Sequence, residues 1–136
     1  MHYLTTRIEF SAYHKLWNPN FTPQQNEEVY EECSRGHGHN YIVEVTVKGN
    51  ADPQTGMVMD LKKLNRLIKQ EIYTYCDHKN LNQDVTFLEG VIPTAENLST
   101  VFWKVLAPKI KDANLYRVRV CESQKNVAEY YGDVLN

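Results

Sequence analysis

The sequence predicts an α+β domain in which one antiparallel sheet is backed by two helices. Two observations carry this prediction: apolar and polar residues alternate in segments near both ends of the chain, and two segments between them have apolar residues at helical spacing. The element order is therefore β-β-α-α-β-β, two hairpins separated by a pair of helices. Because the 136 residues contain no repeat and no linker, we expect a single domain over residues 1–136.

The first hairpin is predicted from two alternating segments. Its first strand spans residues 3–13, and one face of it, continued by the next position, carries Ile8, Phe10, Ala12 and His14. Residues 15–32 follow as a loop with a helical turn, because they are polar and contain two prolines. In the second strand apolar and polar residues alternate cleanly from His39 on, and every second residue from Tyr41 to Val47 is apolar. One face of this strand is expected to be buried and the other exposed.

The helices follow a turn over residues 49–56. Asp60 is the predicted N-cap of the first helix, whose apolar residues recur at helical spacing: Leu61, Leu64, Ile68, Ile72 and Tyr75. Thr94 is predicted to cap the second helix, which has its own apolar stripe: Leu98, Val101, Phe102, Val105 and Leu106. Two final strands are predicted over residues 115–122 and 127–131.

A four-stranded sheet of this kind has two open edges, which a protein must cover, blunt or pair. Pairing of edges between subunits would close several copies into a barrel, with Tyr130, Tyr131 and the valine-rich second strand at the interface. A monomer with charged edges is the alternative that the pattern leaves open.

The composition excludes several classes of protein. A net charge of -2 argues against a general nucleic-acid or membrane-surface binder. The first residues have no apolar signal core, and no stretch reaches membrane-spanning length, so we expect a cytoplasmic protein. The 3 cysteines are an odd number without disulfide-framework spacing, which fits a reducing compartment.

Three histidines are predicted to converge on one metal ion. His37 and His39 are two residues apart in a strand, so they project from the same face. His14 ends the neighbouring strand, and pairing of the two strands brings the three imidazoles together. We expect zinc rather than iron or copper, because zinc suits imidazole ligands and needs no redox chemistry. Three nitrogen ligands without a fourth protein ligand are typical of a catalytic zinc site rather than a structural one.

Cys33 is a candidate for acid–base chemistry beside that metal. The loop around it is polar, and it leads directly into the histidines. A metal cation and Arg35 are expected to lower the pKa of the thiol and supply thiolate near neutral pH. The alternative is that Cys33 packs as a small buried apolar residue.

The Asp77-His78 pair and Glu122 each have a functional and a purely structural interpretation. Asp77 could orient His78 as in a hydrolase relay, although His78 could equally cap the end of a helix. Glu122 ends a strand on the same face as apolar residues, where a ligand presenting N–H groups would satisfy the carboxylate. A solvated glutamate at a strand end is the competing interpretation.

Six ordered motifs run through nearly the whole chain: residues 10–14 (FSAYH), Cys33 with 37–41 (HGHNY), 55–60 (TGMVMD), 77–81 (DHKNL), 93–97 (PTAEN) and Glu122. Together they resemble the family of 6-pyruvoyl-tetrahydropterin and 6-carboxy-tetrahydropterin synthases. The resemblance implies the tunnelling fold, in which three subunits close a barrel and two such rings stack into a homohexamer. It also implies zinc held by the residues that match the family's ligands: His14, His37 and His39.

The resemblance further implies roles in catalysis on 7,8-dihydroneopterin triphosphate. Cys33 matches the general base, and Asp77 with His78 matches a proton relay contributed by a neighbouring subunit. Glu122 matches the residue that anchors the pterin ring. Thr94 and Glu96 match a segment that lies close to the ring. No nucleic-acid or membrane partner is implied.

The product is not decided by the motifs. Three residues separate Cys33 from His37, as in the carboxy branch, which favours a lyase that makes 6-carboxy-tetrahydropterin and acetaldehyde for queuosine biosynthesis. The long segment before Cys33 is more similar to the pyruvoyl branch, which makes 6-pyruvoyl-tetrahydropterin for tetrahydrobiopterin. Tyr13 departs from the family, which usually has a small residue there. A catalytically silent pterin-binding protein is a further alternative, and a zinc hydrolase is disfavoured because no carboxylate neighbours the histidines in sequence.

Overall fold

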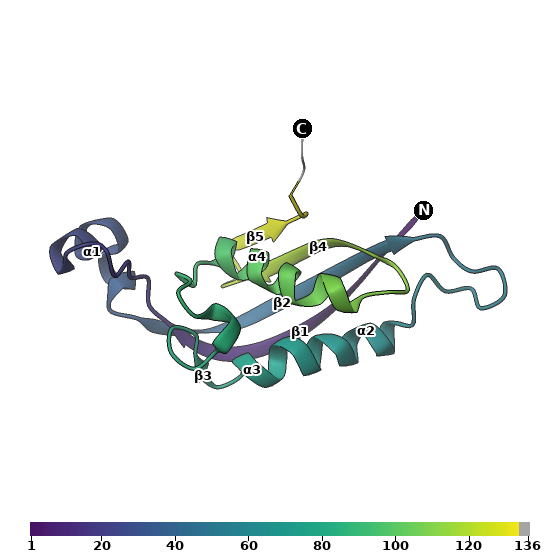
Figure 1. The fold of residues 1–136 in the computed structure, drawn as a ribbon, viewed down its shortest axis with the longest axis horizontal. Coiled ribbons are helices and arrows are strands. Elements are labelled where there is room, and N and C mark those ends of the chain that lie inside the picture. Colours follow the sequence, from purple (N-terminus) through teal and green to yellow (C-terminus); the bar gives the residue numbers. More distant parts are fainter. Residues whose placement is uncertain (134–136) are drawn as a thin grey trace.

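The computed structural model describes residues 1–133, which form a five-stranded sheet with its main helices on one face (Figure 1). The strands lie in the order β3-β1-β2-β4-β5. Their bounds are β1 (His2–His14), β2 (His37–Gly49), β3 (Lys79–Asn80), β4 (Asn114–Cys121) and β5 (Val127–Tyr130). The α+β class and the four long strands are confirmed. Within these residues the sheet is open rather than closed into a barrel, with β3 and β5 at its edges.

The pairing of β1 with β2 confirms the first predicted hairpin and places the histidines together. The antiparallel register runs from His2 opposite Gly49 to His14 opposite His37. The alternating face of each strand is buried, as predicted, in both β1 and β2. The second strand begins at His37, so His37 and His39 are both strand residues, as their spacing predicted. The first strand likewise extends to His14 itself.

The second face of β2 is more buried than predicted. Glu44 and Thr46 point away from the helices and are nevertheless buried. Arginines from β1 and β4 surround the Glu44 carboxylate, at 3.4 Å for Arg7 and 3.2 Å for Arg119. Their side chains cover that part of the sheet, which a pattern of alternating apolar residues does not reveal.

The short strand β3 makes the sheet mixed, so the prediction of a purely antiparallel four-stranded sheet is wrong. It runs parallel to β1 beside Ala12 and Tyr13. It is fixed by backbone hydrogen bonds, including one of 2.8 Å from the Leu81 N–H to the Tyr13 carbonyl. Two polar residues carry no alternation, so the sequence gives no signal for this strand.

The predicted helices form where their caps are. The Asp60 carboxylate accepts a hydrogen bond of 2.9 Å from the Lys62 N–H and begins α2 (Leu61–Ile68). The helix continues through a π-helical segment, Lys69–Tyr73, into α3 (Thr74–Cys76). Thr94 Oγ1 accepts a hydrogen bond of 3.1 Å at the start of α4 (Ala95–Leu106).

The segment between β1 and β2 contains more helix than predicted. A capping box between Thr22 and Gln25 begins α1 (Pro23–Tyr30), and a 3-10 helix follows over Glu31–Ser34. Figure 1 shows α1 beyond the end of the sheet where β1 stops and β2 starts. The helix has little apolar patterning, which explains why only a helical turn was expected.

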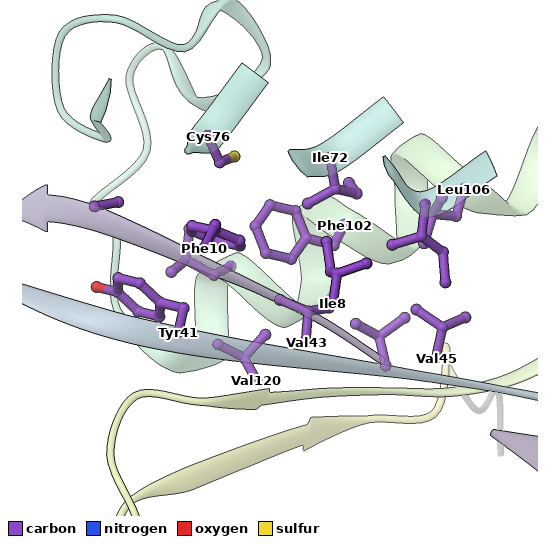
Figure 2. Close-up of a cluster of buried hydrophobic side chains, with 14 of the residues drawn as sticks. Ile8, Phe10, Tyr41, Val43, Val45, Ile72, Cys76, Phe102, Leu106 and Val120 are labelled. Carbon is purple, nitrogen blue, oxygen red and sulfur yellow. The ribbon is translucent and has the colours of Figure 1, made fainter. Parts of the chain in front are cut away.

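The hydrophobic core lies between the sheet and α2, α3 and α4 (Figure 2). Phe10 stacks on Tyr41 with ring centroids 5.3 Å apart and meets Phe102 of α4 edge-on at 6.4 Å. These contacts attach α4 to the two strands that carry the histidines. None of the helices in residues 1–133 combines the length and apolar character needed to span a bilayer.

Replacing Phe102 by alanine is expected to lower the free energy of unfolding by about 3–5 kcal/mol, because it leaves a cavity in a fully buried aromatic cluster. Urea unfolding followed by circular dichroism measures this change. Phe21→Ala is the matched control, since Phe21 is 37% exposed and should lose clearly less stability than the fully buried Phe102. Equal losses in the two variants would contradict the assignment of Phe102 to the core.

Candidate metal and acid–base site

Four side chains converge where β1 ends and β2 begins. His14 comes from the last position of β1, His37 and His39 from the start of β2, and Glu122 follows β4 directly. One ligand atom from each of the four lies within 4.8 Å of all the others. His14 Nε2 is 3.3 Å from His37 Nε2, and Glu122 Oε1 is 3.1 Å from His14 Nε2 and 3.2 Å from His39 Nε2. The cluster could therefore bind a metal ion.

The chemistry of the donor atoms supports a cation at this cluster. His14 Nδ1 lies 2.8 Å from the Pro93 carbonyl oxygen. A carbonyl can only accept, so Nδ1 donates, and Nε2 of the neutral ring presents its lone pair to the cluster. His39 Nε2 is buried and has no hydrogen-bond partner. A histidine lone pair that faces a carboxylate oxygen in a buried place fits a bound metal ion.

The titration of these histidines also suits metal binding. Burial, the largest cause, lowers the pKa of both His14 and His39 below the ordinary imidazole value. A lowered pKa means that the neutral ring, which is the form that binds metal, dominates at neutral pH. Protons therefore compete for these nitrogens only in more acidic solution.

The Pro93 carbonyl is a functional group that the histidine spacing did not reveal. It orients His14 from the segment before α4, directly next to Thr94. The Thr94 hydroxyl itself caps α4 through the Asn97 N–H. Glu96 lies exposed in the first turn of α4, and within residues 1–133 its carboxylate forms no ion pair. The structure thus links this segment to the metal cluster through the backbone, while these two side chains lie outside the cluster.

Cys33 lies in the 3-10 helix Glu31–Ser34, and its carbonyl accepts a hydrogen bond of 2.9 Å from the Leu16 N–H just after β1. Burial raises the pKa of the Cys33 thiol, and the nearby carboxylates of Glu32 and Glu122 raise it further. Arg35 was expected to lower this pKa. Its guanidinium instead pairs with Glu27, with 2.5 Å between Nη2 and Oε1. The expectation for Arg35 is therefore wrong, and a bound cation would have to supply any lowering.

Tyr13 holds the short loop between Cys33 and His37. Its hydroxyl donates a hydrogen bond of 3.2 Å to the Arg35 carbonyl. Gly36 has a left-handed backbone, with φ +87°, and a Cβ there would lie 1.9 Å from the Tyr13 hydroxyl oxygen. The ring therefore occupies the space that only a glycine leaves free. This contact explains how a bulky residue is accommodated where the family usually has a small one.

Gly36→Ala is expected to destabilise the protein by roughly 1–3 kcal/mol, because the new methyl group meets both a strained backbone and the Tyr13 ring. Tyr13→Phe removes only the hydrogen bond and should cost about 0.5–1.5 kcal/mol. Thermal unfolding measures both changes. Gly90→Ala is the control for backbone strain alone, since Gly90 has φ +76° and no neighbouring atom within 4 Å of the place that the new methyl group would take. A loss at Gly36 no larger than at Gly90 would contradict the packing role of Tyr13.

Asp77 and His78 contact each other, as the relay prediction requires. His78 Nδ1 is 2.9 Å from Asp77 Oδ2, and Asp77 Oδ1 accepts a hydrogen bond of 3.1 Å from the Ser11 N–H. These contacts, that with His78 first, lower the pKa of Asp77. His78 has φ +60° and donates its N–H to the Ser11 carbonyl at 2.6 Å. The pair is thus anchored to β1, and the His78 ring turns to Asp77 rather than to the helix end.

The pair lies apart from the other catalytic candidates in one chain. Across residues 1–133, no hydrogen bond or ion pair joins Asp77 or His78 to Cys33 or to the histidine cluster. His78 instead lines a cavity of about 530 Å³ with Ser11 and Asn40, and His39 borders it. A second cavity, of about 550 Å³, contains Glu122 and is bordered by the same histidine.

The fold and the site together define a class: small α+β domains with a candidate metal centre at the junction of their first two strands. Residues 3–133 match the model of the family described as 6-pyruvoyl tetrahydropterin synthase. The chain belongs to this family of lyases.

Several relatives are similar along most of the chain. The 6-pyruvoyl tetrahydrobiopterin synthase of Poecilia reticulata is 42% identical over 133 residues, which cover 96% of this chain and 90% of that protein. The human protein of the same name is 39% identical over 132 residues, covering 96% and 91%. A solved structure of the Caenorhabditis elegans 6-pyruvoyl tetrahydropterin synthase has a TM-score of 0.91 and 32% identity, covering 97% of this chain and 96% of that one.

The carboxy branch is represented by a more partial match. The putative 6-carboxy-5,6,7,8-tetrahydropterin synthase of Archaeoglobus fulgidus is 36% identical over 100 residues, which cover 74% of this chain and 79% of that protein. The names of the relatives therefore support the alternative of the sequence analysis, a pyruvoyl synthase, better than its first expectation, a carboxy synthase.

Proposed function

We propose that this protein converts 7,8-dihydroneopterin triphosphate to 6-pyruvoyl-tetrahydropterin with release of triphosphate. The observation that carries the proposal is the cluster of His14, His37 and His39 in a chain whose relatives are named 6-pyruvoyl tetrahydrobiopterin synthase. The reaction is an elimination combined with an internal redox step, in which the side chain of the substrate is oxidised as its ring is reduced. No external oxidant or reductant is required.

The three histidines would hold zinc, which has a preference for imidazole nitrogen and no redox chemistry of its own. Zinc bound there would act as a Lewis acid on the side-chain hydroxyls of the substrate and acidify the neighbouring C–H bonds. The Pro93 carbonyl would keep His14 in the tautomer that offers Nε2 to the metal.

Cys33 would act as general base and take a carbon-bound proton at Sγ. Asp77 would orient His78, which returns a proton elsewhere on the substrate, as the 2.9 Å contact between them supports. Glu122 would accept N–H groups of the pterin ring in bidentate fashion. Thr94 and Glu96 would lie near the ring, beside the segment that orients His14.

We further propose that the active protein is a homohexamer of two stacked trimers, with relay and base contributed by different subunits. Two features support this: the open sheet edges at β3 and β5, and the lack, within residues 1–133, of any hydrogen bond or ion pair between the relay pair and Cys33. Sedimentation equilibrium should give six times the 15.9 kDa subunit mass. A monomer with full activity would contradict the shared site.

Mass spectrometry of the products tests the reaction itself. Zinc-loaded protein incubated with 7,8-dihydroneopterin triphosphate should accumulate 6-pyruvoyl-tetrahydropterin without acetaldehyde. Formation of 6-carboxy-tetrahydropterin with acetaldehyde would instead establish the carboxy branch, which the three-residue spacing between Cys33 and His37 favours. Unchanged substrate would contradict both lyases and favour a catalytically silent pterin-binding protein.

A further inference from the structure

We propose that Glu122 is a fourth ligand of the resting metal site and leaves the metal when a pterin binds. The inference rests on the proposed function, in which the same carboxylate anchors the pterin ring. Glu122 would then have two alternative partners, the metal and the pterin ring. The metal site would open as the substrate binds.

Three of the separations between ligand atoms fit a metal site that includes Glu122. In a regular tetrahedron whose corners lie about 2.0–2.1 Å from the central ion, adjacent corners are about 3.3–3.4 Å apart. The Nε2 atoms of His14 and His37 are 3.3 Å apart. Glu122 Oε1 lies 3.1 Å from His14 Nε2 and 3.2 Å from His39 Nε2. The carboxylate oxygen therefore lies at ligand-to-ligand distance from two of the three histidines, and all four ligand atoms lie within 4.8 Å of one another.

The hydrogen bonding of His14 makes its short separation from Glu122 costly without a cation. Because its Nδ1 donates to the Pro93 carbonyl, its Nε2 offers a lone pair rather than a proton. A carboxylate oxygen 3.1 Å from that lone pair has no proton to accept. His39 Nε2 lies 3.2 Å from the same oxygen without the geometry of a hydrogen bond. A metal ion held between His14 Nε2 and the Glu122 carboxylate would replace this repulsion by attraction to both atoms.

Glu122 also borders a cavity that its carboxylate can enter when it leaves the metal. Its backbone N–H is fixed by a hydrogen bond of 3.0 Å to the Asn126 carbonyl, in the turn after β4. Its side chain is 22% exposed and lines the cavity of about 550 Å³ that His39 also borders. A rotation of the side chain would thus move the carboxylate from the metal into the cavity, while the strand stays in place. The N–H groups of a pterin in that cavity would hold it there.

Glu122→Gln tests the ligand, because the amide keeps the shape of the side chain and is a poor metal ligand. Competition with a chromophoric chelator should show zinc affinity falling by at least about 10-fold, comparable to or beyond the loss of an outer-shell partner. The control Glu89→Gln changes an exposed carboxylate without an ion pair within residues 1–133 and should bind zinc as the unchanged protein does. Circular dichroism establishes that both variants are folded. Unchanged zinc affinity in Glu122→Gln would overturn the proposal.

Cobalt(II) in place of zinc tests the release of Glu122 by its visible absorption. The probe is 6-methylpterin, which has no side-chain hydroxyl that could ligate the metal. Its addition should change the spectrum of the unchanged protein towards that of Glu122→Gln, and should weaken cobalt binding, because one carboxylate cannot serve both partners. A spectrum that is unaffected by saturating 6-methylpterin would overturn the release.

These measurements separate the inference from the proposed function. If Glu122→Gln binds zinc weakly and the pterin changes the cobalt spectrum, the inference holds even where the unchanged protein forms no tetrahydropterin from the triphosphate. If the unchanged protein forms 6-pyruvoyl-tetrahydropterin and Glu122→Gln binds zinc normally, the proposed function holds and the inference fails.

Discussion

His39→Ala is expected to abolish turnover and to weaken zinc binding by more than about 100-fold, because it removes one of three nitrogen ligands from the cluster. His39 is also the ligand that borders both cavities, so its loss should affect metal and substrate together. Elemental analysis after dialysis and competition with a chelator measure the metal. Tetrahydropterin formation measures turnover.

The matched control is His2→Ala, which removes an exposed imidazole at the start of β1 and should leave metal content unchanged. The pH dependence provides a second check. Because burial lowers the pKa of His14 and His39, zinc affinity should hold from neutral pH down to below the ordinary imidazole pKa, and then fall as protons displace the metal. Stoichiometric zinc in His39→Ala at the affinity of the unchanged protein would show that the metal binds elsewhere.

The parts of the fold that the sequence predicts are those with a strong period. Val43, Val45 and Val47 alternate without interruption, so β2 and its buried face could be expected from the chain alone. The strand β3 and the helix α1 depend on hydrogen bonds to β1 and on a capping box, neither of which leaves an apolar pattern.

The candidate site likewise has parts that the sequence predicts and parts that it does not. The spacing of His37 and His39, with His14 at a strand end, was sufficient to predict their convergence, because strand geometry is regular. The place of Glu122 was not predictable from spacing, since it depends on how far β4 extends beside β2. For Arg35 the sequence suggested a contact that the structure does not contain. Its proximity to Cys33 in sequence suggested an effect on the thiol, but its guanidinium pairs with the Glu27 carboxylate.

Cys33→Ala is expected to lower kcat by roughly 10²–10⁴-fold, the usual contribution of a positioned general base, while zinc affinity stays unchanged. Cys33 lies outside the cluster of possible ligands, which contains His14, His37, His39 and Glu122. Loss of turnover with full metal content would therefore separate proton transfer from metal binding. Stopped assays of tetrahydropterin formation, with zinc measured on the same samples, give both quantities.

The pH profile makes the assignment of Cys33 more specific. Burial and neighbouring carboxylates raise the pKa of its thiol, so the fraction of thiolate, and with it kcat, should rise as pH increases through neutrality. A bound cation would shift that rise to lower pH. Cys33→Ala should lose this dependence and retain only a slow background rate. If Cys33→Ala has a normal kcat, or keeps the pH dependence of the unchanged protein, another group removes the proton. If Cys33→Ala instead fails to bind zinc, the thiol belongs to the metal site.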